Sequence, residues 1–267
     1  MTAPVSPVEA KACCAAAYST DLVAMVLGES YHPGGRALTR RLADVTGLRA
    51  GQRVLDVASG PGTTAVLIAQ EFGVTVDGVD LSAASVQRAV AAGQAAGLRA
   101  RVRFHTGDAE RLPFQDATFD AVICECAFCT FPDKQAAAAE LARVLRPGGR
   151  IGLSDVTLSP GDLPPELLGL AGWVACLADA RPLEEYATLL DDAGLEAVTL
   201  ERHDHALITM IEQVRARLSA LRSVARSSSA LRGVDFGQAL ELTEQAAAAA
   251  QRGYVGYGLL VARRPTA

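Results

Sequence analysis

Residues 54–64 contain the pattern that most constrains how this chain can fold. Two apolar residues lead into Asp56, a Gly-x-Gly turn at Gly60 and Gly62 follows, and an apolar run at 65–69 continues as a helix would. This is the arrangement of a strand, a tight glycine loop and a helix start, in which backbone N–H groups can approach a nucleotide-like ligand. The segment therefore predicts a site for a cofactor that contains a nucleotide.

Asp80 lies where such a site is expected to contact ribose. It follows the strand-like run 74–79, and a carboxylate at the end of a second strand can accept hydrogen bonds from both ribose hydroxyls. Two cofactors compete for this pattern, a nicotinamide dinucleotide and S-adenosylmethionine. The dinucleotide fingerprint asks for a third glycine, but counting from Gly60 and Gly62 places Ala65 at that position. The match to a dinucleotide site is therefore incomplete.

Strand-like and helical segments alternate through most of the chain. The first five predicted strands cover 53–57, 74–79, 102–105, 118–124 and 150–155, and the helices between them cover 64–72, 82–96 and 134–145. Two further predicted strands, 196–202 and 254–262, flank a helical region at 208–251. This alternation predicts an α/β fold with a doubly wound, mostly parallel seven-stranded sheet, in which the terminal pair of strands can run antiparallel.

Three segments organise the chain. Residues 1–50 are predicted to form an N-terminal helical segment, and residues 51–158 a cofactor-binding core. Residues 159–267 are predicted to form the acceptor-site and C-terminal part of the same domain, with a further helix expected near 164–177. We expect the helical region at 208–251 to form a cap over the site or a dimer surface.

Charge and hydropathy exclude several classes of partner. The 267 residues include 25 Lys and Arg against 30 Asp and Glu, a net charge of −5, and no basic tail is present. Nucleic acids and anionic membranes are therefore not expected to bind. The sequence also has no uninterrupted apolar stretch of membrane-spanning length and no signal-peptide pattern at residues 1–7. We expect a cytoplasmic protein that acts on a small molecule or a metalloid.

The six cysteines, at positions 13, 14, 124, 126, 129 and 176, are clustered. A reducing cytosol would keep them as thiols, so their clustering suggests metal, metalloid or redox chemistry. A continuous fourth strand would place Cys124 and Cys126 on one face, with Cys129 able to turn back toward them. Two structural interpretations remain open. Buried free cysteine is common as a small apolar core residue, and Cys126-x-x-Cys129 could be half of a zinc site.

Five motifs between residues 54 and 155 resemble those of class I methyltransferases and occur in the same order. They cover residues 56–62, 78–82, 107–114, 119–120 and 143–149. The resemblance implies a Rossmann-like fold and S-adenosylmethionine as the methyl donor. It also implies a set of cofactor-binding residues: Asp56, Ala58, Gly60, Gly62, Asp80, Leu81, Asp108, Ala109 and Glu125.

Each polar residue in this set has an expected role. Gly60 and Gly62 leave room for the methionine moiety, and Asp80 accepts hydrogen bonds from the ribose. Asp108 accepts from the adenine amino group, and Glu125 orients the amino group of the cofactor. The alternative roles are helix capping for Asp80, turn capping for Asp108 and a solvated strand end for Glu125.

Two other segments resemble the arsenite methyltransferase family. In that family a cysteine closes the fourth strand shortly before an Asp-Lys pair, as Cys126 does here before Asp133 and Lys134. The segment 172–180 supplies a second match at Cys176. The resemblance implies that Cys126 and Cys176 hold trivalent arsenic.

The glycine-flanked loop at 30–35 lacks the cysteine that the family usually has, so either Cys13 or Cys14 supplies a third sulfur or the acceptor needs only two. Cys129, which can turn back from the strand end, is a further candidate for that site. Thiolates are the soft ligands that a thiophilic element prefers, and cysteines with a lowered pKa would supply them. The arsenic lone pair would attack the methyl group in line, so positioning would matter more than a general base. A thiol reductant is expected to accompany the reaction.

Two other functions remain open. The first is methylation of carbon, oxygen or nitrogen on a small organic metabolite, a reaction that commonly needs a base for hydroxyl or carbon acids. Only Glu125 stands out as an acid at the fourth strand. The second is a binding protein that sequesters or senses a soft metal through its thiols. Fold analogy alone does not choose among these functions.

Overall fold

Seven strands form one sheet in the order β3-β2-β1-β4-β5-β7-β6. The computed structural model describes residues 7–159, 177, 179–225, 228 and 231–266. The strands are β1 (Arg53–Val57), β2 (Thr75–Asp80), β3 (Val102–Thr106), β4 (Phe119–Glu125), β5 (Leu145–Leu158), β6 (Glu196–Arg202) and β7 (Val255–Arg263). The first five strands pair in parallel, while β7 runs antiparallel to both β5 and β6. The predicted doubly wound, mostly parallel sheet is confirmed.

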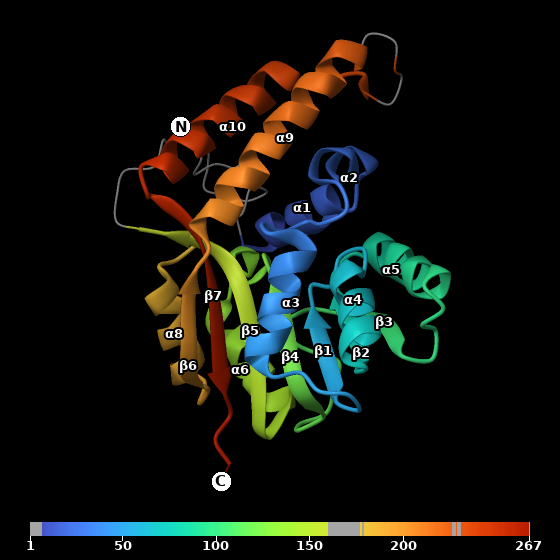
Figure 1. Ribbon diagram of the computed structural model, residues 1–267, viewed down its shortest axis with the longest axis vertical. Helices are drawn as coiled ribbons and strands as arrows, with labels where there is room; N and C mark the ends of the chain where they lie inside the picture. The colour runs from blue at the N-terminus through green and yellow to red at the C-terminus, as the bar shows by residue number, and fades with distance from the viewer. Residues whose placement is uncertain (1–6, 160–176, 178, 226–227, 229–230, 267) are drawn as a thin grey trace.

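Helices cover both faces of the sheet. The helices are α1 (Pro7–Tyr18), α2 (Asp21–Leu27), α3 (Gly35–Thr46), α4 (Thr63–Phe72), α5 (Ala83–Ala95), η1 (Phe128–Thr130), α6 (Lys134–Val144), α8 (Leu183–Asp192), α9 (Asp204–Val224) and α10 (Phe236–Gln251). Figure 1 shows α3 and α4 in front of the sheet and α6 behind it. A sheet covered on both faces needs apolar residues on both sides of its strands. Accordingly, four of the five residues of β1 and eight of the nine residues of β7 are buried.

The main core joins the three segments that the sequence suggests. It includes Leu38 and Leu42 of α3, Leu55 of β1, and Leu260 of β7, all nearly inaccessible to solvent. A smaller cluster of Leu218, Leu231 and Phe236 holds α9 and α10 together beyond the carboxyl ends of the strands (Figure 1). No helix in the described part of the chain is long and apolar enough to cross a membrane.

Two local expectations differ from the structure, and a third is not tested by it. The strand β5 begins at Leu145, before the expected position 150, because Leu145 pairs with Phe119 ahead of a register shift in β4. The helical region expected at 208–251 is two helices, α9 and α10, and α9 already begins at Asp204. The helix expected near 164–177 lies almost entirely outside the described residues.

Candidate active site

A pocket opens at the carboxyl ends of β1, β2 and β4. The strand order reverses between β1 and β4, and open α/β sheets bind their ligands at such a switch point. The lining residues that bear on the chemistry are Lys11, Cys14, Tyr18, Tyr31, His32, Asp56, Ala58, Gly60, Asp80, Leu81, Asp108, Ala109, Glu125, Cys126 and Phe131. Figure 1 shows α1 and α2 near this end of the sheet, with α9 and α10 extending beyond it.

The glycine loop between β1 and α4 turns through left-handed backbone conformations. Gly60 has a φ of 51° and Gly62 a φ of 83°, values that glycine adopts without strain. A Cβ atom added to Gly60 would meet nothing within 4 Å, so this residue leaves the pocket open. A Cβ on Gly62 would lie 2.9 Å from side-chain atoms of Ala89 and Phe104. Gly62 therefore lets the loop pack against α5 and β3, and it is not among the residues that line the pocket.

Asp80 fixes the glycine loop to the end of β2. Its Oδ2 accepts a hydrogen bond from the Gly60 amide at 2.8 Å, and its Oδ1 accepts one from the Ser82 amide at 2.8 Å. Burial raises the pKa of the Asp80 carboxyl, and these two amide bonds oppose that rise. A carboxylate oxygen can accept more than one hydrogen bond, so Asp80 retains the capacity to bind ribose hydroxyls.

Asp56 is the most deeply buried acid of the site. Burial raises the pKa of its carboxyl well above the usual value, and the nearby charges of Glu125 and Asp80 raise it further. Its Oδ2 atom has no hydrogen-bond partner among the described residues. A buried acceptor without a partner is a position that a donor group of a ligand can satisfy.

Asp108 follows β3 and is ion-paired with the N-terminal helix. The Nζ atom of Lys11 lies 2.8 Å from its carboxylate, and the Glu110 amide donates to its Oδ1 at 2.9 Å. Burial alone would raise the pKa of Asp108, but the hydrogen bonds from Lys11 and Glu110 and the Lys11 charge lower it overall. Asp108 is therefore a carboxylate at neutral pH, at the position expected to meet adenine.

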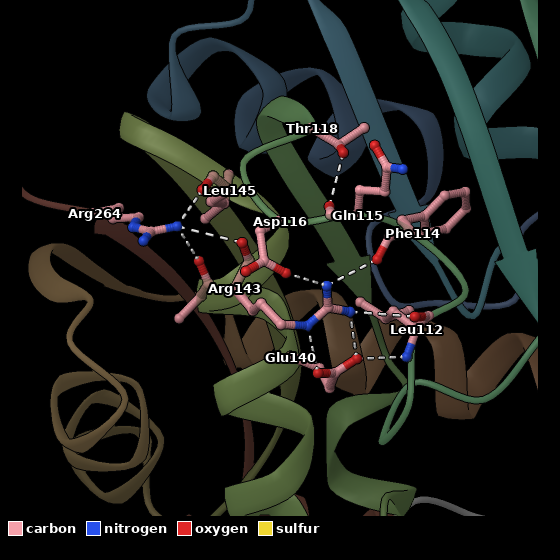
Figure 2. Close-up of polar contacts among 10 residues, drawn as sticks. Leu112, Phe114, Gln115, Asp116, Thr118, Glu140, Arg143, Leu145 and Arg264 are labelled. Carbon is pink, nitrogen blue, oxygen red and sulfur yellow. Dashed lines mark hydrogen bonds and ion pairs between the residues drawn. The ribbon is translucent and has the colours of Figure 1, made fainter.

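The segment that carries Asp108 is anchored to α6 by one arginine. Figure 2 shows Arg143 donating to the carbonyls of Leu112 and Phe114 and to the carboxylates of Glu140 and Asp116. Glu140 in turn accepts the Leu112 amide at 2.7 Å. These contacts hold residues 112–116 in place, and so they also fix the C-terminal end of the loop that begins at Asp108.

Glu125 ends β4 in a buried network that the sequence reasoning did not find. It accepts hydrogen bonds from Thr64 Oγ1 at 2.7 Å and Thr39 Oγ1 at 3.1 Å. His32 Nε2 lies 3.6 Å from Glu125 Oε2, and His32 Nδ1 lies 3.1 Å from the Pro33 carbonyl oxygen. The one sequence signal for this network is a histidine that directly precedes Pro-Gly-Gly in the turn at 31–35. The buried position of Glu125 differs from the solvated strand end that was the alternative.

Two of the candidate cysteines line the pocket. Cys14 from α1 and Cys126 both line it, whereas Cys13 and Cys129 do not. Cys129 is buried in η1, where its amide donates to Asp155 Oδ2 at 3.0 Å. Cys176 lies outside the described residues. Within the described residues no group of three or more His, Cys, Asp or Glu side chains could hold a metal ion.

The predicted common face of Cys124 and Cys126 is wrong. The strand ends at Glu125, and Cys126 has a φ of 52°, so it leaves the strand in a left-handed conformation. Cys124 is fully buried in the core, and burial, followed by the nearby Asp155 carboxylate, raises the pKa of its thiol well above the usual value. Cys124 is therefore a core residue and not a reactive thiol.

Known proteins share this fold. A family model described as a methyltransferase domain matches residues 54–149. The crystal structure of a putative sarcosine dimethylglycine methyltransferase from Galdieria sulphuraria superposes with a TM-score of 0.78 at 22% identity, covering 87% of this chain and 86% of that one. The sheet and its glycine loop thus define the Rossmann-like fold of class I methyltransferases.

The chain is also similar in sequence to proteins of known activity. The 27-O-demethylrifamycin SV methyltransferase of Amycolatopsis mediterranei is 32% identical over 259 residues, which cover 92% of this chain and 93% of that protein. The arsenite methyltransferase of Halobacterium salinarum is 35% identical over 164 residues, which cover 58% of this chain and 40% of that protein. The chain belongs to the S-adenosylmethionine-dependent methyltransferases.

Proposed function

We propose that this enzyme transfers a methyl group from S-adenosylmethionine to a hydroxyl oxygen of a small organic molecule. The observation that carries the proposal is the match along almost the whole chain to a relative named for methylating 27-O-demethylrifamycin SV. The match to an arsenite methyltransferase covers only 58% of this chain. The pocket also has aromatic walls, since the rings of Tyr18 and Tyr31 lie 6.3 Å apart and Phe131 lines the same space. Such walls suit an organic acceptor.

The pocket fits a cofactor that carries positive charge. Asp56, Asp80 and Glu125 lie close enough together that the last two raise the pKa of the first, and Asp56 Oδ2 lacks a partner. S-adenosylmethionine bears a sulfonium and an ammonium group, and these would offset the repulsion among the three acids. When bound, this cofactor supplies an electrophilic methyl group on its sulfonium sulfur.

The residues that would hold the cofactor follow from their places in the pocket. Asp80 would accept from the ribose hydroxyls, while Asp108 and Ala109 would meet the adenine beside Leu81. Gly60 and Ala58 leave room for the methionine portion, and Asp56 and Glu125 would face its ammonium group. In-line transfer depends mainly on this positioning.

His32 is the group proposed to take the proton that a hydroxyl acceptor must lose. Its Nδ1 lies 3.1 Å from the Pro33 carbonyl oxygen, so we assign the ring proton to Nδ1. Nε2 is then the basic atom, and it lies 3.2 Å from Thr39 Oγ1 and 3.6 Å from Glu125 Oε2. A carboxylate at this distance stabilises the imidazolium that forms when Nε2 takes a proton.

The test is turnover of the purified enzyme with S-adenosylmethionine and a panel of alcohols that includes macrocyclic polyketides and phenols. Mass spectrometry would detect the methylated product, and the S-adenosylhomocysteine formed would be quantified in a separate assay. We expect methyl ether formation that falls by about a hundredfold in His32→Gln, the loss typical of a missing general base. Cofactor binding by calorimetry without turnover of any alcohol would contradict the proposal.

A second candidate acceptor is arsenite, and one observation favours it. Cys14 and Cys126 line the same pocket, and two thiolates are a suitable site for a thiophilic element. The same assay with arsenite and a thiol reductant separates the two acceptors. If arsenite is the substrate, Cys14→Ser and Cys126→Ser abolish methylation of arsenic. If an alcohol is the substrate, both variants keep most of the activity.

A further inference from the structure

The N-terminal helix α1 forms one wall of the cofactor pocket. Lys11, Cys14 and Tyr18 from this helix line the same space as Gly60 and Asp80. These α1 residues recur at helical spacing, so one face of the helix is turned toward the pocket. A ligand bound beside the glycine loop would therefore lie between the strand ends and α1.

Lys11 joins this helix to the segment that follows β3. Its Nζ atom lies 2.8 Å from the Asp108 carboxylate and 2.5 Å from Glu110 Oε2. The side chain of Lys11 is 19% exposed, as is that of Glu110, while Asp108 is 35% exposed. Partial burial weakens the screening of these charges by water and salt, so the contact is stronger than a pair on the open surface.

The composition of the chain makes this lysine unusual. Only two of the 25 basic residues are lysines, Lys11 and Lys134, and all the others are arginines. Lys134 shows what the ammonium group does in this fold, because it donates to the carbonyls of Cys129 and Phe131 and to Asp179. Both ammonium groups thus bind several oxygens that converge on one point. Such a site suits a compact three-donor cation better than the planar fork of arginine.

We propose that Lys11 fastens α1 over the bound cofactor, so that cofactor and product exchange only when Lys11 leaves Asp108 and Glu110. The inference rests on the proposed function, which places the adenine at Asp108. Asp108 keeps acceptor capacity beyond its bonds to Lys11 and the Glu110 amide, so helix and nucleoside can hold the same carboxylate together. Lys11 is in this sense a positioning residue for α1 and controls the exchange rate.

The first experiment measures how fast S-adenosylhomocysteine dissociates, by rapid displacement of the radiolabelled compound. Lys11→Met removes the charge and keeps an apolar chain of similar length. We expect S-adenosylhomocysteine to dissociate about tenfold faster, the change expected when hydrogen bonds to a charged group are lost. Lys11→Arg should restore at least part of the slow rate, and high salt should accelerate the wild type more than Lys11→Met. Arg263→Met is the matched control, because Arg263 pairs with Glu196 at an exposed position on the sheet.

The second experiment reads the contact directly. An amine-selective acylating reagent followed by peptide mass spectrometry reports Lys11 separately from Lys134, which is 6% exposed and serves as the internal reference. We expect S-adenosylhomocysteine to slow the labelling of Lys11 and to leave Lys134 unchanged.

The two results also separate this inference from the proposed function. Suppose that the wild type binds S-adenosylhomocysteine, but its dissociation is unchanged in Lys11→Met and the ligand does not change the labelling rate of Lys11. The proposed role of Lys11 is then wrong, while the proposed function stands. If the wild type does not bind S-adenosylhomocysteine in calorimetry, the proposed function fails and this inference fails with it.

Discussion

The Oδ2 atom of Asp80 accepts a hydrogen bond from the backbone amide of Gly60 at 2.8 Å. This bond joins the end of β2 to the glycine loop that follows β1. The residue expected to hold ribose therefore also sets the shape of the loop expected to hold the methionine portion. The two halves of the cofactor pocket are coupled through one carboxylate.

Replacement of Asp80 should consequently cost more than one ligand contact. In Asp80→Ala the Gly60 and Ser82 amides lose their acceptor, and we expect S-adenosylhomocysteine to bind about a hundredfold more weakly. Asp80→Asn keeps one carbonyl oxygen and should lose about tenfold. Isothermal titration calorimetry gives both values. Unchanged affinity in Asp80→Ala would show that the cofactor does not depend on this carboxylate.

Asp56 should make the protein less stable as the pH rises. Its pKa is raised in the folded state by burial and by the neighbouring carboxylates, so the folded chain binds more protons than the unfolded chain above the ordinary pKa of an aspartate. Stability then falls as the pH rises from that value through the raised folded pKa.

Asp56→Asn should remove this dependence and increase the free energy of unfolding at pH 8 by about 1–3 kcal/mol, the scale of an unsatisfied buried polar group. Urea unfolding of both proteins at pH 5 and pH 8, without ligand, measures this difference in unfolding free energy. The same variant should bind S-adenosylmethionine less tightly, because the pocket loses a negative charge. If Asp56→Asn is less stable than the wild type at pH 8, the negative charge of Asp56 does not destabilise the folded protein and the prediction is wrong.

Thr64 should contribute through its hydrogen bond to Glu125. Thr64→Val keeps the side-chain shape but removes the donor that lies 2.7 Å from Glu125 Oε2. We expect the free energy of unfolding to fall by about 1.5–3 kcal/mol, the range for a hydrogen bond to a charged group. Thr75→Val is the control, since the Thr75 hydroxyl makes an exposed 3.3 Å bond to the Gln52 carbonyl. Urea unfolding measures both variants. Equal losses of unfolding free energy in the two would show that the bond to Glu125 contributes no more than an exposed hydrogen bond.

Arg143 should stabilise the segment behind Asp108 more than its neighbour Arg146 does. Arg143→Met leaves the Leu112 and Phe114 carbonyls and the Glu140 carboxylate without their shared donor (Figure 2). We expect a loss of about 2–4 kcal/mol in stability and weaker cofactor binding. Arg146→Met removes an exposed pair with Asp120 and an exposed 3.3 Å bond to the Ala117 carbonyl, and should cost at most about 1 kcal/mol. A smaller effect for Arg143→Met than for Arg146→Met would contradict this order.

The sequence predicted the cofactor half of the fold well because its signals are local. The apolar runs of β1 and β2 are buried on both faces, and the glycines between them have the positive φ that the loop requires. Leu145 shows the limit of local signals. It lies two residues before Pro147 and joins the sheet through its pairing with Phe119, which is distant in the sequence. No local pattern encodes that pairing.

The acceptor half was harder to predict because its residues meet only in three dimensions. His32 and Glu125 are far apart in the sequence and belong to a turn and a strand end. The sequence alternation would place Cys126 in a continuous β4. Cys126 instead has a left-handed backbone conformation, so the strand ends at the residue before it. Lys11 gave no signal by itself, since its partners Asp108 and Glu110 come from another segment.

The position of β7 in the sheet has a consequence for how the chain is made. β7 lies between β5 and β6 although it follows both of them in the sequence. During synthesis on the ribosome, β6 therefore emerges before the only strand with which it pairs among the described residues. The parallel part of the sheet, β1 to β5, is complete much earlier and can assemble while translation continues. Late folding of β6 and β7 would leave the outer edge of β5 exposed to chaperones until residues 255–263 leave the exit tunnel.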